Sequence, residues 1–448
     1  MKRYDSYVHV DSPWFYSIPG EWKQTRLKSL TTYISRGQTP SYTDDETCPK
    51  VINQALFSRG FWNKEKIRYT ASESINNANI AKVGDVLLAS TGGGVLGKVF
   101  CFDQPDLYIA DSHVTIIRTR EQLSGRYLYY YLSVRYDAIN ALLSKGSTNQ
   151  TELQEFPLKN MPVPVPPRDE QDQIVRYLDW QVSKINRLIS AKRKEIDLTR
   201  EYLSVKIEDA FNSVIGTSSV MLPLGRYIRK IESGTSVNSI MGSANAGAPG
   251  VLSTSCVYGN CFNASQNKQV APIDYERVSC PVRKDTVIVS RMNTPSLVGA
   301  CGYSDKDIDN VFLPDRLWQV YFNDTLMPEF VWRYLSRQSV QSWFATIATG
   351  SSNTMKNITK LQFKTVLIPN IDLEKQKRVT EIIRKIMDKR NTSCQLYEKT
   401  ISNLQDLRTR LISDVVTGQI DVRSIKVPDY ELVDEVVHDS EDEEPEVE

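Results

Sequence analysis

The segment whose spacing comes closest to a chemical motif is glycine-rich, Gly92-Gly-Gly-Val-Leu-Gly97-Lys98-Val99. It fits the G-x-x-x-x-G-K pattern of a phosphate-binding loop, in which backbone amides and the lysine hold the phosphates of a nucleotide. Val99 stands where a hydroxyl would bind Mg²⁺, and Val-Phe-Cys-Phe after the lysine is typical of a strand, whereas such a loop must begin a helix. The pattern therefore favours a glycine-rich hairpin over a nucleotide site, with a loop that approaches a DNA backbone as the functional alternative.

Motifs for other chemistries are missing from the sequence. We find no H-E-x-x-H, G-x-S-x-G or G-x-G-x-x-G, no Asn/Asp-Pro-Pro-aromatic tetrapeptide of amino-methyltransferases and no nuclease-like Pro-Asp with acidic-x-Lys. His113 lies in a strand-like run, where a core or surface residue is expected rather than a general base. The sequence predicts a chain that is not an enzyme by itself; an enzyme acting alone is the alternative that an activity assay would reveal.

The seven cysteines are scattered and odd in number, which favours free thiols over a disulfide framework. A zinc cluster is disfavoured because the spacing is irregular, without a C-x2-C pair, and two of the three histidines lie in the terminal regions. We therefore expect no metal and no cofactor on this chain. No apolar run reaches the length of a spanning helix and no signal-like segment follows Met1, so a cytoplasmic protein is expected. The residues weighed for zinc are Cys256, Cys261, Cys280 and Cys301.

The charge of the 448-residue chain is unevenly distributed. Its 55 Lys and Arg against 54 Asp and Glu give a net charge of +1, which by itself argues against an electrostatically bound partner. Eleven of the acidic residues lie in 429–448, where there is no Lys or Arg, so residues 1–428 hold 55 basic against 43 acidic residues, a net +12. A basic body suits nucleic acid. The acidic tail, residues 426–448, is expected to be disordered; a minority hypothesis is that it competes with DNA for the basic surfaces.

An internal repeat of about 200 residues divides the chain. Residues 85–90 match 285–290, Gln171 matches Gln376, and Gly216 matches Gly418, all in the same order. The offset drifts from 197 for Leu27 and Leu224 to 205 for the glutamines, as loops of different length would cause. The organisation is therefore a globular domain, a long helix, a second globular domain, a second long helix and the acidic tail.

The two long helices are indicated by apolar residues at helical spacing. Residues 169–215 contain no Gly or Pro, follow Pro166-Pro167 and end at Gly216; residues 373–417 repeat the pattern and end at Gly418. Each would be about 65–70 Å long, with one apolar stripe, so we expect the two stripes to pair as an antiparallel coiled coil. The residues predicted to pair are Ile174, Leu178, Ile185, Ile189, Leu203, Ile207, Ile383, Ile386, Leu404 and Leu411.

Each globular domain alternates short β-rich runs with turn signals and then has an aromatic-rich helical stretch, residues 127–143 in the first and 330–347 in the second. This pattern predicts two similar α+β domains with mostly antiparallel strands, separated by the paired helices in a pseudo-twofold relation. Basic residues that could reach phosphates occur in both, among them Arg36 and Arg229.

The chain resembles the specificity subunits of type I restriction-modification systems. The strongest match is Gly146-Ser147-Thr148 followed by Leu158, Pro164, Pro166-Pro167, Glu170-Gln171, Ile174 and Leu178, which is similar to the family's junction between recognition domain and first helix. Ile18-Pro19-Gly20-Glu21-Trp22 with Leu27 resembles the family's start, and residues 411–423 resemble the end of its second helix. The second junction departs from the pattern, because residues 368–376 lack the double proline and Lys375 separates Glu374 from Gln376. The acidic tail is also outside the pattern.

The resemblance implies a noncatalytic DNA reader. Each recognition domain, residues 1–167 and 217–370, would read one half of a bipartite asymmetric site. The helices, residues 168–216 and 371–425, would set the spacing and dock two methyltransferase subunits, with restriction subunits completing the complex. S-adenosylmethionine would be held by the methyltransferase subunits, and ATP and Mg by the restriction subunit.

Polar and glycine-containing loops supply the candidate DNA contacts. Ordinary turn chemistry is the competing interpretation for each of them. The other functional class is a coiled-coil scaffold without sequence-specific DNA binding, which the same apolar stripes would suit. The candidate contacts are Thr91, Lys98, Ser147, Thr148, Asn149, Gln150, Arg291, Asn293, Ser351, Ser352 and Asn353.

Overall fold

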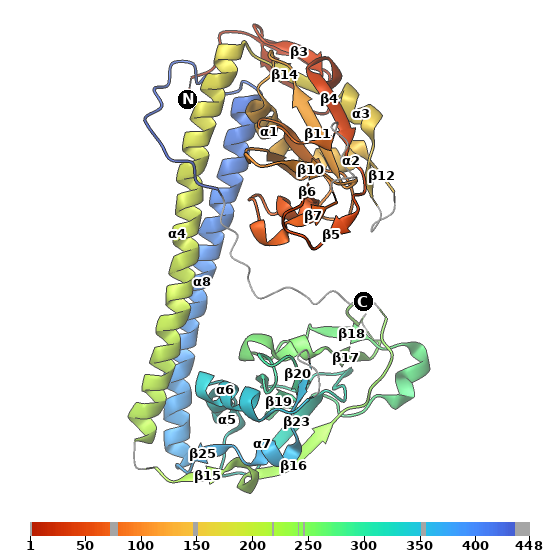
Figure 1. Cartoon of the computed structure of the whole chain (residues 1–448). Coiled ribbons are helices and arrows are strands. Elements are labelled where there is room, and N and C mark those ends of the chain that lie inside the picture. The colour runs from red at the N-terminus through yellow and green to blue at the C-terminus, as the bar shows by residue number, and fades with distance from the viewer. Residues whose placement is uncertain are drawn as a thin grey trace. The chain divides into compact units, whose positions relative to one another are not determined.

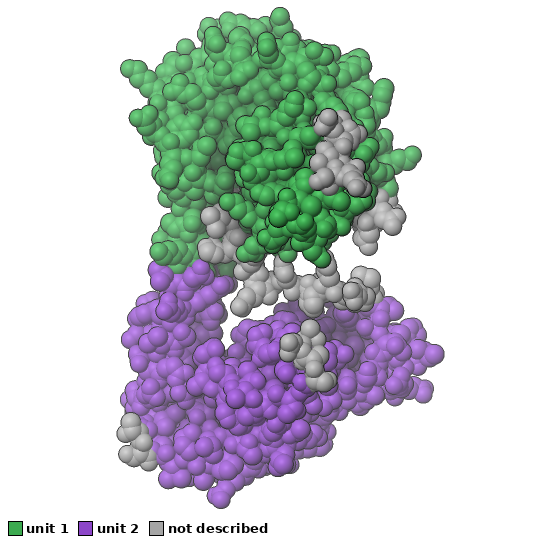
Figure 2. Space-filling model, viewed as in Figure 1, with its two compact units in different colours: residues 1–196, 396–448 green, residues 197–395 purple. Residues whose placement is uncertain are grey.

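The computed structural model describes residues 2–71, 79–146, 151–216, 219–240, 242–244, 247–350 and 355–434. The chain forms two compact units, coloured separately in Figure 2. Unit 1 comprises residues 1–196 and 396–448, and unit 2 comprises residues 197–395. Unit 1 is therefore assembled from two separate stretches of the chain, whereas unit 2 is one continuous stretch.

Unit 1 contains two four-stranded sheets. The first, in the order β4-β11-β8-β9, is antiparallel throughout, and its strand β8 is buried at every position. The second, in the order β10-β6-β7-β5, contains one parallel pair, β10 with β6. The strands of the first sheet are β4 (Thr31–Arg36), β8 (Val86–Ala89), β9 (Val99–Cys101) and β11 (Val114–Thr119). The strands of the second are β5 (Tyr42–Thr43), β6 (Lys50–Ile52), β7 (Arg68–Thr70) and β10 (Tyr108–Ala110).

Short elements connect these sheets to the long helices. The two hairpins β1-β2 and β12-β13 and the pair β3-β14 are all antiparallel, and β14 leads directly into the first long helix. The α-helices are α1 (Gly125–Ser133), α2 (Tyr136–Leu143) and α3 (Glu155–Asn160), and the 3-10 helices are η1 (Leu27–Ser29), η2 (Gln54–Leu56) and η3 (Lys64–Lys66). The strands are β1 (Tyr7–His9), β2 (Ser17–Pro19), β3 (Lys23–Arg26), β12 (Ser144–Lys145), β13 (Glu152–Leu153) and β14 (Pro162–Val165).

Unit 2 repeats the arrangement of unit 1. Its main sheet has the order β16-β23-β19-β21 and is antiparallel, β17 pairs in parallel with β22, and β15 pairs with β25 as β3 does with β14. Two similar α+β domains are therefore confirmed. The main strands are β15 (Met221–Pro223), β16 (Ile228–Ser233), β17 (Gly250–Leu252), β18 (Asn267–Gln269), β19 (Thr286–Ser290), β21 (Cys301–Ser304), β22 (Val311–Phe312), β23 (Leu317–Phe322) and β25 (Leu367–Pro369). The remaining elements are β20 (Met292–Asn293), β24 (Lys356–Asn357), η6 (Leu224–Arg226), η7 (Thr254–Asn260), η8 (Pro272–Arg277), α5 (Pro328–Leu335), α6 (Gln338–Ile347) and α7 (Lys360–Lys364).

Each aromatic-rich stretch that the sequence predicts as one helix is two helices. In unit 1 the break falls at Val134 and Arg135, between α1 and α2, and in unit 2 at Ser336 and Arg337, between α5 and α6. Arg337 has extended backbone angles (φ −64°, ψ 138°), which no helix continues through. Apolar periodicity does not register such a break, because both halves bury residues in the same core.

The long helices are α4 (Arg168–Ile215) and α8 (Leu373–Val416), shown in Figure 1. In unit 1 the first half of α4 shares a core with the end of α8, and in unit 2 the second half of α4 shares a core with the start of α8. The helices are therefore antiparallel, as predicted. Of the residues predicted to pair, the unit 1 core contains Ile174, Leu178, Ile185, Ile189 and Leu411, and Leu404 packs against it. The unit 2 core contains Ile383, and Ile207 and Ile386 pack against it. The tenth residue, Leu203, is also buried.

These stripes do more than pair the two helices. Ile174 and Leu178 lie in one continuous core with the sheet and with α1, so the helix ends are part of the globular domains. Leu407 of α8 follows Leu404 at helical spacing, but its side chain is 54% exposed. Toward its end α8 buries Leu411 and Val415 and also Ile412 and Val416 in the core of unit 1.

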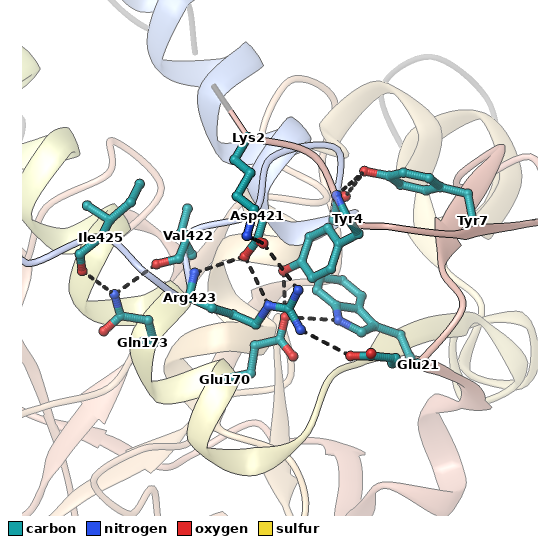
Figure 3. Close-up of polar contacts among 12 residues, drawn as sticks. Lys2, Tyr4, Tyr7, Glu21, Glu170, Gln173, Asp421, Val422, Arg423 and Ile425 are labelled. Atoms are coloured by element: carbon teal, nitrogen blue, oxygen red, sulfur yellow. Dashed lines mark hydrogen bonds and ion pairs between the residues drawn. The ribbon is translucent and has the colours of Figure 1, made fainter.

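The segments before β3 and after α8 meet at the first turn of α4 (Figure 3). Buried Glu170 accepts hydrogen bonds from the Tyr4 hydroxyl and from Trp22 Nε1. The Arg423 guanidinium donates to both oxygens of Asp421, over 3.0 and 3.1 Å, and to Glu21 Oε2 over 3.1 Å. We call this cluster, Lys2, Tyr4, Glu21, Glu170, Asp421 and Arg423, the terminal junction. It ties both outer segments of unit 1 to α4.

Candidate nucleic-acid interface

One glutamine in each unit fixes the long helix to the recognition domain. The Gln171 side-chain nitrogen donates to the carbonyls of Pro166 and Gln122 over 2.9 and 3.0 Å, and its oxygen accepts from the Ser124 amide, the N-cap of α1, over 2.8 Å. Gln376 repeats all three bonds, to Ile371, Thr325 and Met327, at 2.9, 2.9 and 2.8 Å. Both side chains are fully buried. The second junction therefore preserves this contact although it lacks the double proline.

The predicted glycine-rich hairpin is confirmed. Strands β8 and β9 pair antiparallel, and the loop between them packs on α2, where Asn140 Nδ2 donates to the carbonyl of buried Leu96 over 2.9 Å. Gly97 has φ +93°, and a Cβ there would lie 3.1 Å from Ile139. The glycine is therefore required for a close approach to α2, and the loop begins no helix that could hold a phosphate.

At the end of β8, polar side chains from four segments of unit 1 lie together. Thr91 Oγ1 is 2.7 Å from His113 Nδ1, and Arg36 Nε donates to the Ser112 carbonyl over 3.0 Å while the same guanidinium forms an ion pair with Glu152. Thr91 and Glu152 also form a β-bridge. We call this group, Arg36, Thr39, Thr91, Ser112, His113 and Glu152, polar corner 1. It is at least partly exposed at every residue.

The equivalent position in unit 2, at the end of β19, carries a second polar group. Arg291 Nε donates to the Asp315 carbonyl over 2.7 Å, as Arg36 does to Ser112. Asn293 pairs with Lys356 between β20 and β24. We call Arg291, Asn293, Asp315, Arg316 and Lys356 polar corner 2. In both units a guanidinium is thus held by a backbone carbonyl beside the end of a buried central strand.

The predicted contacts divide between these places. Thr91 lies in polar corner 1, and Arg291 and Asn293 lie in polar corner 2. Asn293 is 9% exposed and its amide nitrogen lies within hydrogen-bond distance of Ser290 and Tyr258, so it holds the turn in place. Ser147, Thr148, Asn149, Gln150, Ser351, Ser352 and Asn353 lie outside the described residues. Described residues that border those segments contact the corners. Next to Thr91 of polar corner 1, the Gly92 amide donates to the Thr151 carbonyl. In polar corner 2, Lys356 Nζ donates to the Gly350 carbonyl.

Lys98 lies apart from polar corner 1. Its ammonium is 4.4 Å from the Tyr136 ring centroid and lines a cavity of about 540 Å³ that is bounded by α1, α2, α4 and α8 within unit 1. The basic cavity, as we call it, has five cationic residues in its wall, Arg59, Lys98, Arg126, Arg193 and Arg408. Arg126 donates to Asp179 over 2.9 and 3.1 Å; burial acts to lower its pKa, but Tyr130 and Asp179 raise the pKa more, so the guanidinium stays charged.

Sequence reasoning missed Thr39, Ser112 and Glu152, which belong to no motif. They reach polar corner 1 only through pairings across 73 to 116 residues. All seven cysteines are free, as predicted. Within the described ranges no cluster of three or more potential metal ligands occurs, and no helix there is long and apolar enough to cross a bilayer.

The sequence of the chain is similar to proteins of one known family. Residues 19–198 match the family model of the type I restriction modification DNA specificity domain. A protein assigned as the specificity subunit of the type I restriction enzyme MjaX, from Methanocaldococcus jannaschii, is 22% identical over 438 residues, covering 91% of this chain and 95% of that protein. A specificity subunit assigned to a type I restriction enzyme of Haemophilus influenzae is 29% identical over 94 residues, 21% of this chain and 23% of that one.

A solved structure has the same fold. It is a chain from a type I restriction-modification system whose complex assembly and conformational transition were studied; its TM-score is 0.65 at 16% identity, over 91% of this chain and all of that one. The specificity-domain match, the relative aligned along nearly the full length and the repeated domains agree with one another. The chain is therefore similar to type I restriction-modification specificity subunits, by its domain match and along nearly its full length, and it has the fold of a chain from such a system.

Proposed function

We propose that this chain is the DNA sequence-recognition subunit of a type I restriction-modification complex. Each unit reads one half of a bipartite, asymmetric DNA site. The observation that carries the proposal is the presence of a polar corner at the same place in two repeated domains of one chain. Two copies of one reading surface with different side chains suit a site with two different halves.

The chemistry of the corners suits base reading. A base pair is identified by hydrogen bonds at its groove edges, for which arginine, histidine and small hydroxyl side chains are suitable donors and acceptors. Arg36 and Arg291 are each held at Nε by a carbonyl, which fixes the direction in which the terminal nitrogens of the guanidinium point. The net charge of +12 on residues 1–428 supplies the phosphate attraction that does not depend on sequence.

The long helices set the spacing between the half-sites in this proposal. Helix α4 has 48 residues, which gives a length of about 72 Å at 1.5 Å per residue. One turn of duplex is about 34 Å, so a helix of this length spans the distance between two recognition segments on one DNA.

The partners are two methyltransferase subunits that dock on the helices, and restriction subunits that join them. Apolar side chains on α4 and α8 that are more than half exposed support such docking, because partner surfaces bury groups of this kind. The chain itself carries no catalytic group in the proposal: S-adenosylmethionine is bound by the methyltransferase subunits, and ATP and Mg by the restriction subunit. The exposed residues are Leu188, Leu198, Tyr202, Leu396 and Leu407.

Duplex binding measured over a salt series tests the DNA role. A DNA reader loses affinity steeply as salt rises, because bound counterions are released on binding, whereas a coiled-coil scaffold shows essentially no binding at any salt. Adenine methylation by the chain reconstituted with its methyltransferase subunits, read out by methylome sequencing, then identifies the site. Methyl transfer or cleavage by the purified chain alone would contradict the noncatalytic role.

A further inference from the structure

A large apolar side chain is exposed at the same place in each unit. Phe156 of α3 is 78% exposed, and Leu361 of α7 is 75% exposed. Each comes two residues before a fully buried residue, Leu158 in unit 1 and Phe363 in unit 2. Helix α3 lies against η1 as α7 lies against η6. A single exposed apolar side chain is common on protein surfaces, but its presence at the matching position of both repeats indicates a contact that the two units share.

In unit 1 this position is tied to polar corner 1. The Leu153 amide donates to the carbonyl of Ser90 over 2.9 Å, directly beside Thr91 of the corner. Phe156 follows Leu153 by three residues, and three residues extend for at most about 11 Å. The Phe156 backbone therefore lies within about 11 Å of a residue that is bonded to the end of β8.

In unit 2 the same connection is made to polar corner 2. The Ile358 amide donates to the carbonyl of Arg291, a residue of the corner, also over 2.9 Å. Leu361 follows Ile358 by three residues, as Phe156 follows its counterpart in unit 1. One turn of duplex is about 34 Å, so one recognition segment can contact a corner and the neighbouring apolar side chain together.

Cationic residues accompany both apolar side chains. Helices η1, η6 and α7 contain no Asp or Glu, and the one carboxylate of α3, Glu155, forms an ion pair with Lys159. An apolar group with cations beside it fits duplex DNA, in which phosphates border the stacked bases. The cations of these four short helices are Lys28, Lys159, Arg226, Lys360 and Lys364.

We propose that Phe156 and Leu361 are apolar wedges, one for each half-site, that enter the DNA beside the base pairs contacted by the polar corners. Phenylalanine and leucine are among the side chains that insert between neighbouring base pairs and partly unstack them. The cations of the short helices contact the phosphates on either side of the wedge. This role rests on the proposed function and deepens it. The wedges make recognition depend on how easily a base step opens, which is easiest at pyrimidine–purine steps, in addition to hydrogen bonds at base edges.

The fluorescence of 2-aminopurine tests the wedges, because it rises when the base is unstacked. The analogue is placed at successive positions of the site, apart from the adenines that are methylated, in duplexes bound by the chain with its methyltransferase subunits. The natural complex should show one unstacked step in each half-site. Phe156→Ala should remove the signal from one half only, and Leu361→Ala from the other half only. Phe156→Ala, which removes an aromatic contact with a base, should weaken duplex binding about fivefold or more.

Two control variants accompany this measurement. Phe156→Leu should keep the unstacked step, because leucine occupies the matching position of unit 2. Tyr16→Ala removes a 77% exposed aromatic side chain between β1 and β2, and it should change neither the fluorescence nor the affinity. Thermal unfolding establishes that all the variants are folded.

The possible results separate the wedges from the DNA role itself. If the natural complex binds its site with every base stacked, or if Phe156→Ala keeps the signal, the wedges are disproved and the DNA role stands. If Phe156→Ala leaves duplex binding by the chain unchanged but releases the methyltransferase subunits, the side chain contacts a protein and the wedge assignment is overturned. If the natural chain binds no duplex at any salt, with or without those subunits, the proposed function and the wedges fail together.

Discussion

At the scale of single residues, the two junction glutamines show how the repeat is maintained. The sequence pairs Gln171 with Gln376 by position only, and the structure gives the reason, since each makes the same three buried hydrogen bonds. The neighbouring residue differs for an equally physical reason. The Glu170 carboxylate accepts hydrogen bonds from Tyr4 and Trp22 of the N-terminal segment. Lys375, at the matching position of unit 2, is exposed.

Replacing one of these glutamines tests its contribution to stability. Gln376→Met keeps the size of the side chain but leaves one amide and two carbonyls without partners, so we expect unit 2 to lose about 2–4 kcal/mol of unfolding free energy. Urea unfolding followed by tryptophan fluorescence measures the loss. The control Gln338→Met lies at an exposed position and should cost at most about 0.5 kcal/mol. Equal losses in the two variants would contradict the role of Gln376.

The Asp421 carboxyl of the terminal junction makes the stability of unit 1 depend on pH. Burial acts to raise the pKa of Asp421, but hydrogen bonds from Arg423 outweigh it, and the pKa is lowered from its usual value of 3.8. A carboxyl with a lowered pKa stabilises the fold above about pH 4, and this contribution is lost as the pH falls below that value. We expect the urea midpoint of the natural chain to fall more steeply below pH 4 than that of Asp421→Asn. Parallel pH profiles would show that the ion pair contributes nothing.

At the scale of elements, the sequence predicts what is periodic and local. The long helices were expected over residues 169–215 and 373–417, and they lie at Arg168–Ile215 and Leu373–Val416. Buried strands such as β8 and β19 follow from their apolar runs. The breaks at Arg135 and Arg337 were missed, because nothing in the apolar spacing marks them.

The polar corners could be predicted only in part. Thr91 and Arg291 follow buried strands, which is a local signal, but Arg36 meets Glu152 only because two distant segments come together at the same corner. Lys98, which has the strongest motif around it, lies in the basic cavity, because the hairpin packs on α2. Which cations share a surface depends on loop packing, and spacing along the chain does not contain that information.

A proline in α4 tests the importance of helix continuity. Leu203→Pro removes a backbone hydrogen bond at a buried position, which costs about 3 kcal/mol or more and kinks the helix. We expect the reconstituted complex to lose adenine methylation at its site, measured by methylation-sensitive digestion. Lys194→Gln, which changes an exposed polar side chain on the same helix, should keep the activity. Full methylation by the proline variant would refute the spacing role.

At the scale of the whole molecule, the proposed function makes the two units separate readers of one site. Arg36→Ala and Arg291→Ala should each weaken methylation by about 5- to 150-fold, since one base contact contributes about 1–3 kcal/mol. The first variant should become tolerant of base changes in one half of the site only, and the second in the other half only. Methylation of duplex panels with single base changes measures this.

A charge control completes that experiment. Arg229 is an exposed arginine of unit 2 that pairs with Asp324 and lies outside polar corner 2. Arg229→Ala should leave the methylated DNA sequence unchanged. Thermal unfolding of all three variants establishes that they are folded. If both corner variants altered the same half of the site, the assignment of one half to each unit would be wrong.

The composition of unit 1 from two distant stretches has a consequence for biosynthesis. Its core includes Leu411, Val415 and Val416, which leave the ribosome more than 200 residues after β14, whereas unit 2 has its complete core within residues 197–395. Long-range contacts form late and domains fold as their residues emerge, so unit 2 can be finished first and unit 1 must wait for the last segment. During that interval the apolar side chains of α4 that pack on α8 lack this partner and stay exposed, and we expect exposed apolar surface of this kind to favour aggregation of the nascent chain.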